Sequence, residues 1–188
     1  MSKQWVISDL HMGHKLMIEK EYRKVGFEEV IMKALNDCVG KNDTLYLLGD
    51  LAFGRQSYWC NRLGEIPCKT VLVKGNHDQN RDNWYRKRFD EVIPFTEPLF
   101  LDHEWGKVML THIPANPYVL SSYDERFKRL GNHFRKLYKE NNCILNIHGH
   151  THGEAQEKKY TYDATVDAQG LFPKTIDQIL EEKFNESI

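Results

Sequence analysis

The sequence predicts an α/β fold, because short apolar runs alternate with segments of helical periodicity. Each of five runs has the length of a buried strand and is followed by glycine or polar residues: 5–8, 44–48, 70–73, 107–110 and 143–147. Residues 27–39 and 175–184 carry apolar side chains at helical spacing. We therefore expect layers of strands and helices, with polar residues gathered where the strands end.

Each of these segments predicts a specific structural feature. The first helix should bury one face, formed by Val30, Ile31, Ala34, Leu35 and Cys38, and the second should bury Ile176, Ile179 and Leu180. Residues 99–101 and 107–110 flank a turn and predict a hairpin, and 160–166 resemble a late strand or strand pair, so a purely parallel sheet is not expected. Residues 114–142 predict a loop and then a helix at about 125–139, a candidate lid.

Composition narrows the class of protein. A chain of 188 residues suits one domain, here 1–188, and 26 Lys and Arg against 27 Asp and Glu leave no general basic field for nucleic acid. The four cysteines show no CxxC spacing and no signal peptide opens the chain, so we expect a reduced, cytoplasmic protein. No apolar run approaches the roughly 20 residues of a membrane span.

Candidate metal ligands follow the first two predicted strands. Asp9 and His11 stand one residue apart, so that a carboxylate and an imidazole can turn toward a common point. Asp50 follows Gly49, which permits close approach, and its two oxygens can hold two cations. Taken singly, such residues are more often turn or cap formers, so these two motifs depend on the ones that follow.

The third strand leads into Gly75-Asn76-His77-Asp78, a more specific signal. The amide oxygen of Asn76 is a good neutral ligand for a divalent cation, and His77 can face a substrate. An ordinary Gly-Asn turn would explain the first two residues and would give no reason for the last two.

Histidines follow the fourth and fifth strands. His112 stands alone, whereas His148, His150 and His152 occupy alternate positions and project from one side of an extended chain. Several imidazoles packed together are unfavourable unless a cation organises them, and imidazole is the commonest nitrogen ligand of transition metals. Metal binding is therefore the preferred interpretation of this cluster.

The ordered set D-x-H, GD, GNH[DE], H and GHxH resembles the calcineurin-like metallophosphoesterase superfamily over nearly the whole chain. It is most similar to small bacterial and phage phosphoesterases, which begin with a strand and Ser-Asp-Leu-His and often end in a Val-Asp then Pro segment like 166–173. The resemblance implies two mixed β-sheets packed face to face and flanked by helices, a four-layer α/β/β/α sandwich.

The resemblance also implies a role for each motif residue. Two metal ions would be held, the first by Asp9, His11, Asp50 and His152 and the second by Asp50, Asn76, His112 and His150. His77 would stabilise or protonate the leaving oxygen, and Asp78 would orient His77. His148 stays outside the ligand set as a strand residue.

The implied reaction is in-line attack on phosphorus by a hydroxide bound to this dinuclear centre. Oxygen and nitrogen ligands without a thiolate favour manganese, iron or zinc, with magnesium possible, and we expect manganese to support activity.

Protein phosphatases of the superfamily carry GDxxDRG and GNHE, whereas residues 49–55 read GDLAFGR and 75–78 read GNHD, which disfavours that branch. A phosphodiesterase acting on a small phosphodiester or nucleotide is the first choice.

Three alternatives stay open. One is a phosphomonoesterase. Another is a nuclease acting on a nucleic-acid end, with Arg55, Lys74 and the basic residues of 81–88 as a cationic rim and Trp84 and Tyr85 stacking on a base, although helix packing is the simpler account of that segment. The third is a non-catalytic partner-binding scaffold, disfavoured because His77 and every expected ligand are present together. The sequence leaves the natural substrate and the oligomeric state open.

Overall fold

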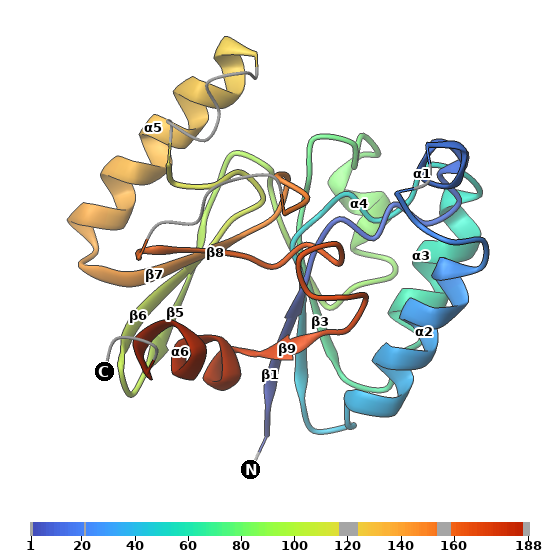
Figure 1. Cartoon of the computed structure of the whole chain (residues 1–188), viewed down its shortest axis with the longest axis horizontal. Coiled ribbons are helices and arrows are strands. Elements are labelled where there is room, and N and C mark those ends of the chain that lie inside the picture. The colour runs from blue at the N-terminus through green and yellow to red at the C-terminus, as the bar shows by residue number, and fades with distance from the viewer. Residues whose placement is uncertain (1, 21, 117–123, 154–158, 186–188) are drawn as a thin grey trace.

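Strands and helices alternate along the computed structural model, which describes residues 2–20, 22–116, 124–153 and 159–185 (Figure 1). In chain order the elements are β1 (Gln4–Ile7), α1 (Lys15–Glu19), α2 (Phe27–Cys38), β2 (Thr44–Leu47), α3 (Gln56–Gly64), β3 (Lys69–Val73), α4 (Asp82–Tyr85), β4 (Glu91–Ile93), β5 (Leu99–His103), β6 (Gly106–Leu110), α5 (Glu125–Glu140), β7 (Cys143–His148), β8 (Thr161–Asp163), β9 (Lys174–Thr175) and α6 (Ile176–Asn185).

The described strands form two mixed sheets. One has the order β4-β3-β2-β1-β9, in which β1 to β4 run parallel and β9 pairs antiparallel with β1. The other has the order β5-β6-β7-β8, in which β5 is antiparallel to β6 and the remaining neighbours are parallel. The expected hairpin is therefore confirmed as β5 and β6, with Asp102 opposite Lys107.

Three apolar clusters fix the order of the layers. The first contains Leu35 of α2 and Ile7 of β1, and it joins α2 and α3 to the first sheet. The second contains Val6 of β1 and Leu145 of β7, and it fills the space between the two sheets. The third packs α5 against the outer face of the second sheet through Phe134. The four-layer sandwich is thus confirmed, and Figure 1 shows α2 and α5 on opposite sides of the sheets.

The strands are apolar on both faces because both faces are covered. Successive residues of β1 alternate between the clusters, Val6 facing the other sheet and its neighbours Trp5 and Ile7 facing the helices. This is why the strands read as continuous apolar runs in the sequence.

The expected helices are present, with one error in a buried face. Ile176, Ile179 and Leu180 of α6 are buried as predicted. In α2, however, Val30 is 46 % exposed, while Phe27 and Met32 are buried instead. The contact face of α2 is thus rotated from the predicted one, away from Val30 and toward Met32, and it also includes Phe27 in the first turn. Of the candidate lid, residues 117–123 lie outside the described part of the chain.

The two sheets meet beside the end of β1. The amide of Ser8 donates to the carbonyl of Ala164, and the amide of Val166 donates to the carbonyl of Ser8, so the loop after β1 is joined to the segment after β8. Loops from both sheets therefore reach one place. No helix in the described residues is long and apolar enough to cross a membrane.

Candidate metal centre

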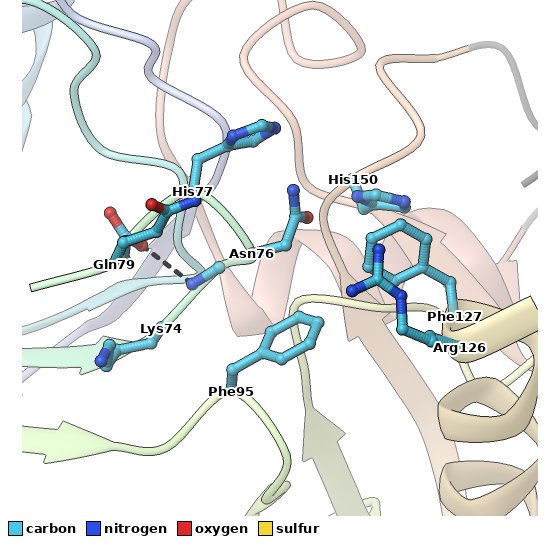
Figure 2. Close-up of a pocket in the computed structure, with 10 residues that line it drawn as sticks. Lys74, Asn76, His77, Gln79, Phe95, Arg126, Phe127 and His150 are labelled. Atoms are coloured by element: carbon cyan, nitrogen blue, oxygen red, sulfur yellow. Dashed lines mark hydrogen bonds between the residues drawn. The ribbon is translucent and has the colours of Figure 1, made fainter. Parts of the chain in front are cut away.

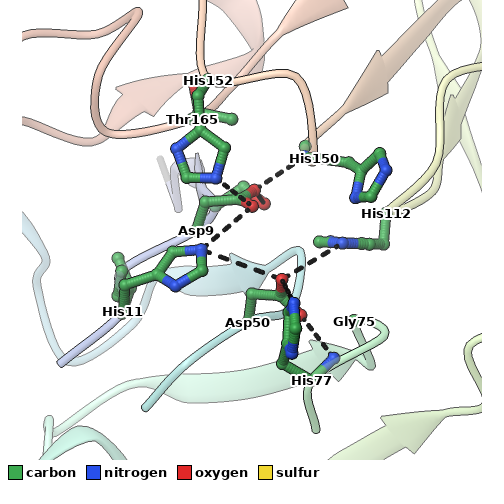
Figure 3. A network of polar contacts seen from close by, with 12 residues as sticks. Asp9, His11, Asp50, Gly75, His77, His112, His150, His152 and Thr165 are labelled. Carbon is green, nitrogen blue, oxygen red and sulfur yellow. Dashed lines mark hydrogen bonds and ion pairs between the residues drawn. The ribbon is translucent and has the colours of Figure 1, made fainter. Parts of the chain in front are cut away.

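The loops after β1, β2, β3, β6 and β7 bring the expected ligand residues together (Figure 3). Backbone hydrogen bonds join these loops in pairs. The amide of Asp9 donates to the carbonyl of Gly49, and the amide of Gly149 donates to the carbonyl of His112, each at 3.0 Å. The carboxyl ends of the parallel strands thus form a common rim, as the sequence pattern predicts.

Asp9 and two histidines form the first group of ligand atoms. Asp9 Oδ1 lies 3.6 Å from His11 Nε2 and 3.4 Å from His152 Nε2. The other oxygen, Oδ2, accepts hydrogen bonds from the Ser8 hydroxyl at 2.5 Å and from the amide of His150 at 2.9 Å. These donors fix the carboxylate so that Oδ1 faces the histidines.

Asp50 lies between this first group and a second group, which contains Asn76, His112 and His150. Its Oδ2 is 3.8 Å from His11 Nε2 and 3.6 Å from His112 Nε2, while Oδ1 accepts the amide of His77 at 2.9 Å. Asn76 Oδ1 is 3.0 Å from His112 Nε2. The His150 ring follows, with its centroid 5.2 Å from that of His112. Every ligand residue expected from the sequence is therefore in or beside one of the two groups.

The residues present fit divalent cations. Asp9 Oδ1 and His11 Nε2 are buried and have no hydrogen-bond partner among the described residues, a state that costs about 1–3 kcal/mol for each polar group. Cation bonds of about 2.0–2.2 Å place neighbouring ligand atoms about 3–3.5 Å apart, close to the separations seen here. In two sets of three residues the ligand atoms all lie within 4.8 Å of one another: Asp9 with His11 and His152, and Asp9 with Asp50 and His112.

The backbone at the site is held in an uncommon conformation. Five of the expected ligand residues have positive φ angles, between 48° and 72°: Asp9, His11, Asp50, His150 and His152. Residues other than glycine rarely adopt this left-handed region, and each such residue costs on the order of 1–3 kcal/mol. Strain concentrated on these residues indicates that the surrounding structure maintains their positions for function.

Two glycines allow the carboxylates of Asp9 and Asp50 to approach the neighbouring loops closely. A Cβ on Gly75 would lie 2.1 Å from Asp50 Oδ1, and a Cβ on Gly149 would lie 2.3 Å from Asp9 Oδ2. The glycines of the GNH and GHxH motifs therefore leave room for the carboxylates that follow β1 and β2.

Neighbouring acceptors set which ring nitrogen of two histidines faces the site. His112 Nδ1 donates to the carbonyl of Leu48 at 2.7 Å, and His152 Nδ1 donates to Asp167 Oδ2 at 2.6 Å. In the neutral form of each ring, Nε2 is then the nitrogen without a proton. This is the arrangement by which metal-binding histidines are oriented in proteins.

Arg23 binds the carboxylate of Asp167, a contact that was not expected from the sequence. Its guanidinium donates to Asp167 Oδ1 at 2.8 Å and Oδ2 at 2.7 Å, and to the carbonyls of Asp9 and Leu10 at 2.8 Å and 2.6 Å. Arg23 thus connects the D-x-H loop with the acidic partner of His152. Buried arginines with several carbonyl contacts have no local sequence signature.

Burial and charge shift the pKa values of the site in opposite directions. Desolvation lowers the pKa of His11 to about 4 and that of His150 to about 3, so both rings are neutral at pH 7. Desolvation also raises the pKa of Asp50 to about 7, an effect that the charge of His112 opposes. For Asp9, burial would raise the pKa, but His112, His11 and His152 together lower it.

The structure corrects the expected role of Asp78. Its carboxylate accepts the amides of Asp50 and Gly75 through Oδ2, both at 2.8 Å, and the amide of Leu51 through Oδ1 at 3.2 Å. Both oxygens are thus directed at backbone, and Asp78 holds the loop that carries Asp50 instead of orienting the His77 ring. His77 is exposed to 44 % of its side-chain area, with Nε2 4.0 Å from Asp50 Oδ2.

A family model for calcineurin-like phosphoesterases matches residues 2–154. The chain belongs to the calcineurin-like phosphoesterases. Metal-dependent hydrolysis of phosphoesters is the activity of this family, and its members typically use divalent metals.

Individual proteins similar to this calcineurin-like phosphoesterase come from phages and a bacterium. The gene 66 protein of Mycobacterium phage L5 is 34 % identical over 171 residues, which covers 81 % of this chain and 78 % of that protein. The gene 66 protein of Mycobacterium phage D29 is 31 % identical over 83 residues, 42 % of each chain. A solved structure of a protein of unknown function from Aquifex aeolicus has a TM-score of 0.80 and 27 % identity, with both chains covered completely.

Other residues of this calcineurin-like phosphoesterase serve packing. The His148 ring is buried, and its Nδ1 contacts the carbonyl of Gly149 at 2.9 Å, in keeping with a strand residue outside the ligand set. The guanidinium of Arg88 lies 3.6 Å from the ring centroid of Trp84, and Trp84 packs against the first core cluster. Helix packing therefore accounts for Trp84, and stacking on a nucleic-acid end stays a prediction. The four cysteines are free thiols.

Proposed function

We propose that this chain is a phosphodiesterase with a dinuclear metal centre. The observation that supports two metals is the position of Asp50 Oδ2, which lies 3.8 Å from His11 Nε2 and 3.6 Å from His112 Nε2. A carboxylate between two groups of nitrogen ligands is suited to bridge two cations. Asp9, His11, Asp50 and His152 would hold one ion, and Asp50, Asn76, His112 and His150 the other.

The charges beside the site favour a diester over a monoester. Lys74 and Arg126 line the adjoining pocket, but each already has a carboxylate partner: Lys74 Nζ is 2.9 Å from Asp82, and Arg126 is 3.1 Å from Asp124. A monoester carries a further negative charge, for which these already paired cations offer less compensation than unpaired ones would. A diester carries a single charge and replaces the other with a second ester group, for which the pocket has room.

Hydrolysis would form a new P–O bond to a water oxygen and break the P–O bond to the departing alcohol, which takes up a proton. Bound divalent cations lower the pKa of a coordinated water and neutralise phosphoryl oxygens. His77 would contact the departing oxygen. Desolvation, and then the charge of His112, lower the pKa of His77, which favours a neutral ring that still carries one N–H donor.

Asp78 and Asp167 would act by positioning other residues of the site. Asp78 would hold the Asp50 loop through its backbone contacts, and Asp167 would orient His152. Manganese is the proposed metal for activity, because the ligand set combines oxygens and imidazoles without a thiolate.

The deciding experiment compares methyl 4-nitrophenyl phosphate with 4-nitrophenyl phosphate as substrates for metal-stripped protein, with Mn²⁺, Zn²⁺ or Mg²⁺ added back. We expect metal-dependent release of 4-nitrophenol with a higher kcat/KM for the diester, and loss of this activity in Asp50→Asn. Preference for the monoester would replace the proposal with a phosphomonoesterase. Stoichiometric metal binding without turnover of either ester would favour the scaffold alternative.

A further inference from the structure

A pocket of about 660 Å³ adjoins the metal centre on the side of Asn76, His77 and His150 (Figure 2). Its volume falls within the range of roughly 300–1,000 Å³ that is typical of small-molecule sites. An ester group attached to a phosphorus beside the expected ligands would extend into this pocket, because two of those ligands, Asn76 and His150, line it.

Phe95 and Phe127 form an aromatic wall of the pocket, referred to below as the Phe95–Phe127 wall. The two ring centroids are 6.4 Å apart and the ring planes are nearly perpendicular, at 89°. The Phe127 centroid is 4.9 Å from that of His150, and the Phe95 centroid is 6.0 Å from that of His112. The wall therefore continues directly from the rings of two expected ligands.

The wall is supported from behind. Phe95 and Phe127 are half-buried and pack against the third apolar cluster, which includes Met109, Ile113 and Phe134. The rings therefore have little freedom to lose when a ligand binds, and preformed aromatic surface is an efficient contact for another flat ring. Covering their exposed part would also remove apolar surface from water.

The polar groups at the edge of the pocket favour an uncharged partner. Lys74 and Arg126 are paired with Asp82 and Asp124, so neither of these lysine and arginine side chains of the described lining is free of a carboxylate partner to bind a second anionic group. Gln79 lines the same pocket with an amide side chain that can both donate and accept hydrogen bonds. A flat, neutral ring with polar edges matches this lining.

We propose that the Phe95–Phe127 wall binds a flat aromatic ester group of the substrate, either the base of a nucleoside or a simple aryl ring. This inference rests on the proposed function, because it places the phosphoryl group beside the metal ligands. It adds a substrate class: phosphoesters that carry an aromatic group on the non-leaving or leaving oxygen.

The test measures binding, so that it does not depend on turnover. Isothermal titration calorimetry of Mn²⁺-loaded protein would compare a nucleoside 5′-monophosphate, phenyl phosphate and methyl phosphate in wild type, Phe95→Ala and Phe127→Ala. Phe100→Ala is the matched control, because Phe100 packs in the same cluster and does not line the pocket. Phe95→Leu and Phe127→Leu replace any alanine variant that fails to fold, as judged by thermal melting.

We expect at least one aromatic ligand to bind about tenfold more tightly than methyl phosphate in wild type and in Phe100→Ala, the range found for stacking on a protein ring. The preference should fall to about threefold or less in the two wall variants. Tighter binding of the nucleoside than of phenyl phosphate would identify the base as the occupant, and equal binding would identify the ring alone.

Equal affinity for all three ligands in wild type, or an unchanged aromatic preference in both wall variants, would overturn the proposal. This outcome differs from failure of the proposed function. Hydrolysis of the diester without a preference for aromatic ligands would overturn the subsite proposal and support the proposed phosphodiesterase function. A preference for aromatic ligands without hydrolysis of any ester would support the subsite and overturn the proposed function.

Discussion

Asp167 Oδ2 accepts a hydrogen bond from His152 Nδ1 at 2.6 Å, and the same carboxylate is bound by both Nε and Nη2 of Arg23. His152 Nε2 in turn lies 3.4 Å from Asp9 Oδ1. A carboxylate behind a metal-facing histidine fixes the tautomer of the ring and raises its basicity. The pKa of Asp167 is lowered to about 2, because its contacts with His152 and Arg23 outweigh the effect of burial.

Asp167→Ala should therefore weaken metal binding by about 10–100-fold, since His152 loses the acceptor that orients it. The measurement is titration of metal-stripped protein with Mn²⁺. Asp102→Ala is the control, because the side chain of Asp102 is 90 % exposed on the β5–β6 hairpin and should leave the affinity unchanged. Unchanged Mn²⁺ affinity in Asp167→Ala would assign the residue to stability alone.

Arg23→Met should lower the free energy of unfolding by about 3–5 kcal/mol, the usual cost of removing one partner of a buried ion pair. The Arg23 side chain is 1 % exposed, and its loss would leave two backbone carbonyls without this donor and Asp167 with His152 alone. Arg23→Lys should recover only part of the loss, because an ammonium cannot reproduce the two parallel contacts.

Chemical denaturation at pH 7 measures both Arg23 variants against Arg62→Met. Arg62 pairs with Glu29 on the surface, and its replacement should cost about 0–1 kcal/mol. Equal losses in Arg23→Met and Arg62→Met would contradict the role assigned to Arg23.

The meeting of the expected ligand residues at one rim could be predicted because each of them follows a strand that is visible as a local apolar run. Asp9, Asp50 and His112 could be placed at a common rim from strand direction alone. Arg23 and Asp167 could not, since 144 residues separate them and their contact depends on how the loops fold over β1. The partners of Asp78 were missed for the same reason, because an acid beside a histidine gives no sign that it turns toward backbone amides.

Metal binding should raise the melting temperature of the wild-type protein. The buried carboxylates of Asp9 and Asp50 face each other across the ligand groups, and a cation would relieve their repulsion as well as satisfy Asp9 Oδ1. At 100 times the dissociation constant, a ligand that binds only the folded state adds about 2.7 kcal/mol. Differential scanning calorimetry with and without Mn²⁺ measures the shift, and Asp50→Asn should abolish most of it. A shift of equal size in that variant would exclude Asp50 as a ligand.

Stability should fall in acid partly through Asp43. Its carboxylate accepts the amides of Lys3 and Gly40 and the indole N–H of Trp5, at 2.8–2.9 Å, and these contacts lower its pKa below the ordinary value. Because the pKa is lower in the folded state than in the unfolded state, this contribution is complete above the ordinary value and is lost as the pH falls through the folded value.

Asp43→Asn should therefore cost about 1.5–3 kcal/mol at pH 7 and make the unfolding free energy less dependent on pH in the acid range. Urea denaturation between pH 2 and about pH 7 tests this, with Asp37→Asn as the control, because Asp37 pairs with Lys33 at an exposed site. Parallel pH profiles for wild type and Asp43→Asn would rule out the proposed linkage.

His77→Ala should reduce kcat about 10²–10⁴-fold and leave Mn²⁺ affinity within about twofold of wild type, because the ring faces the substrate side and belongs to neither ligand group. The amide of His77 would still donate to Asp50, so the loop geometry should survive the substitution. Diesters whose leaving alcohols have lower pKa values should be less affected, since they need less help at the departing oxygen. A rate loss that is independent of the leaving group, or a parallel loss of metal affinity, would instead place His77 in metal binding.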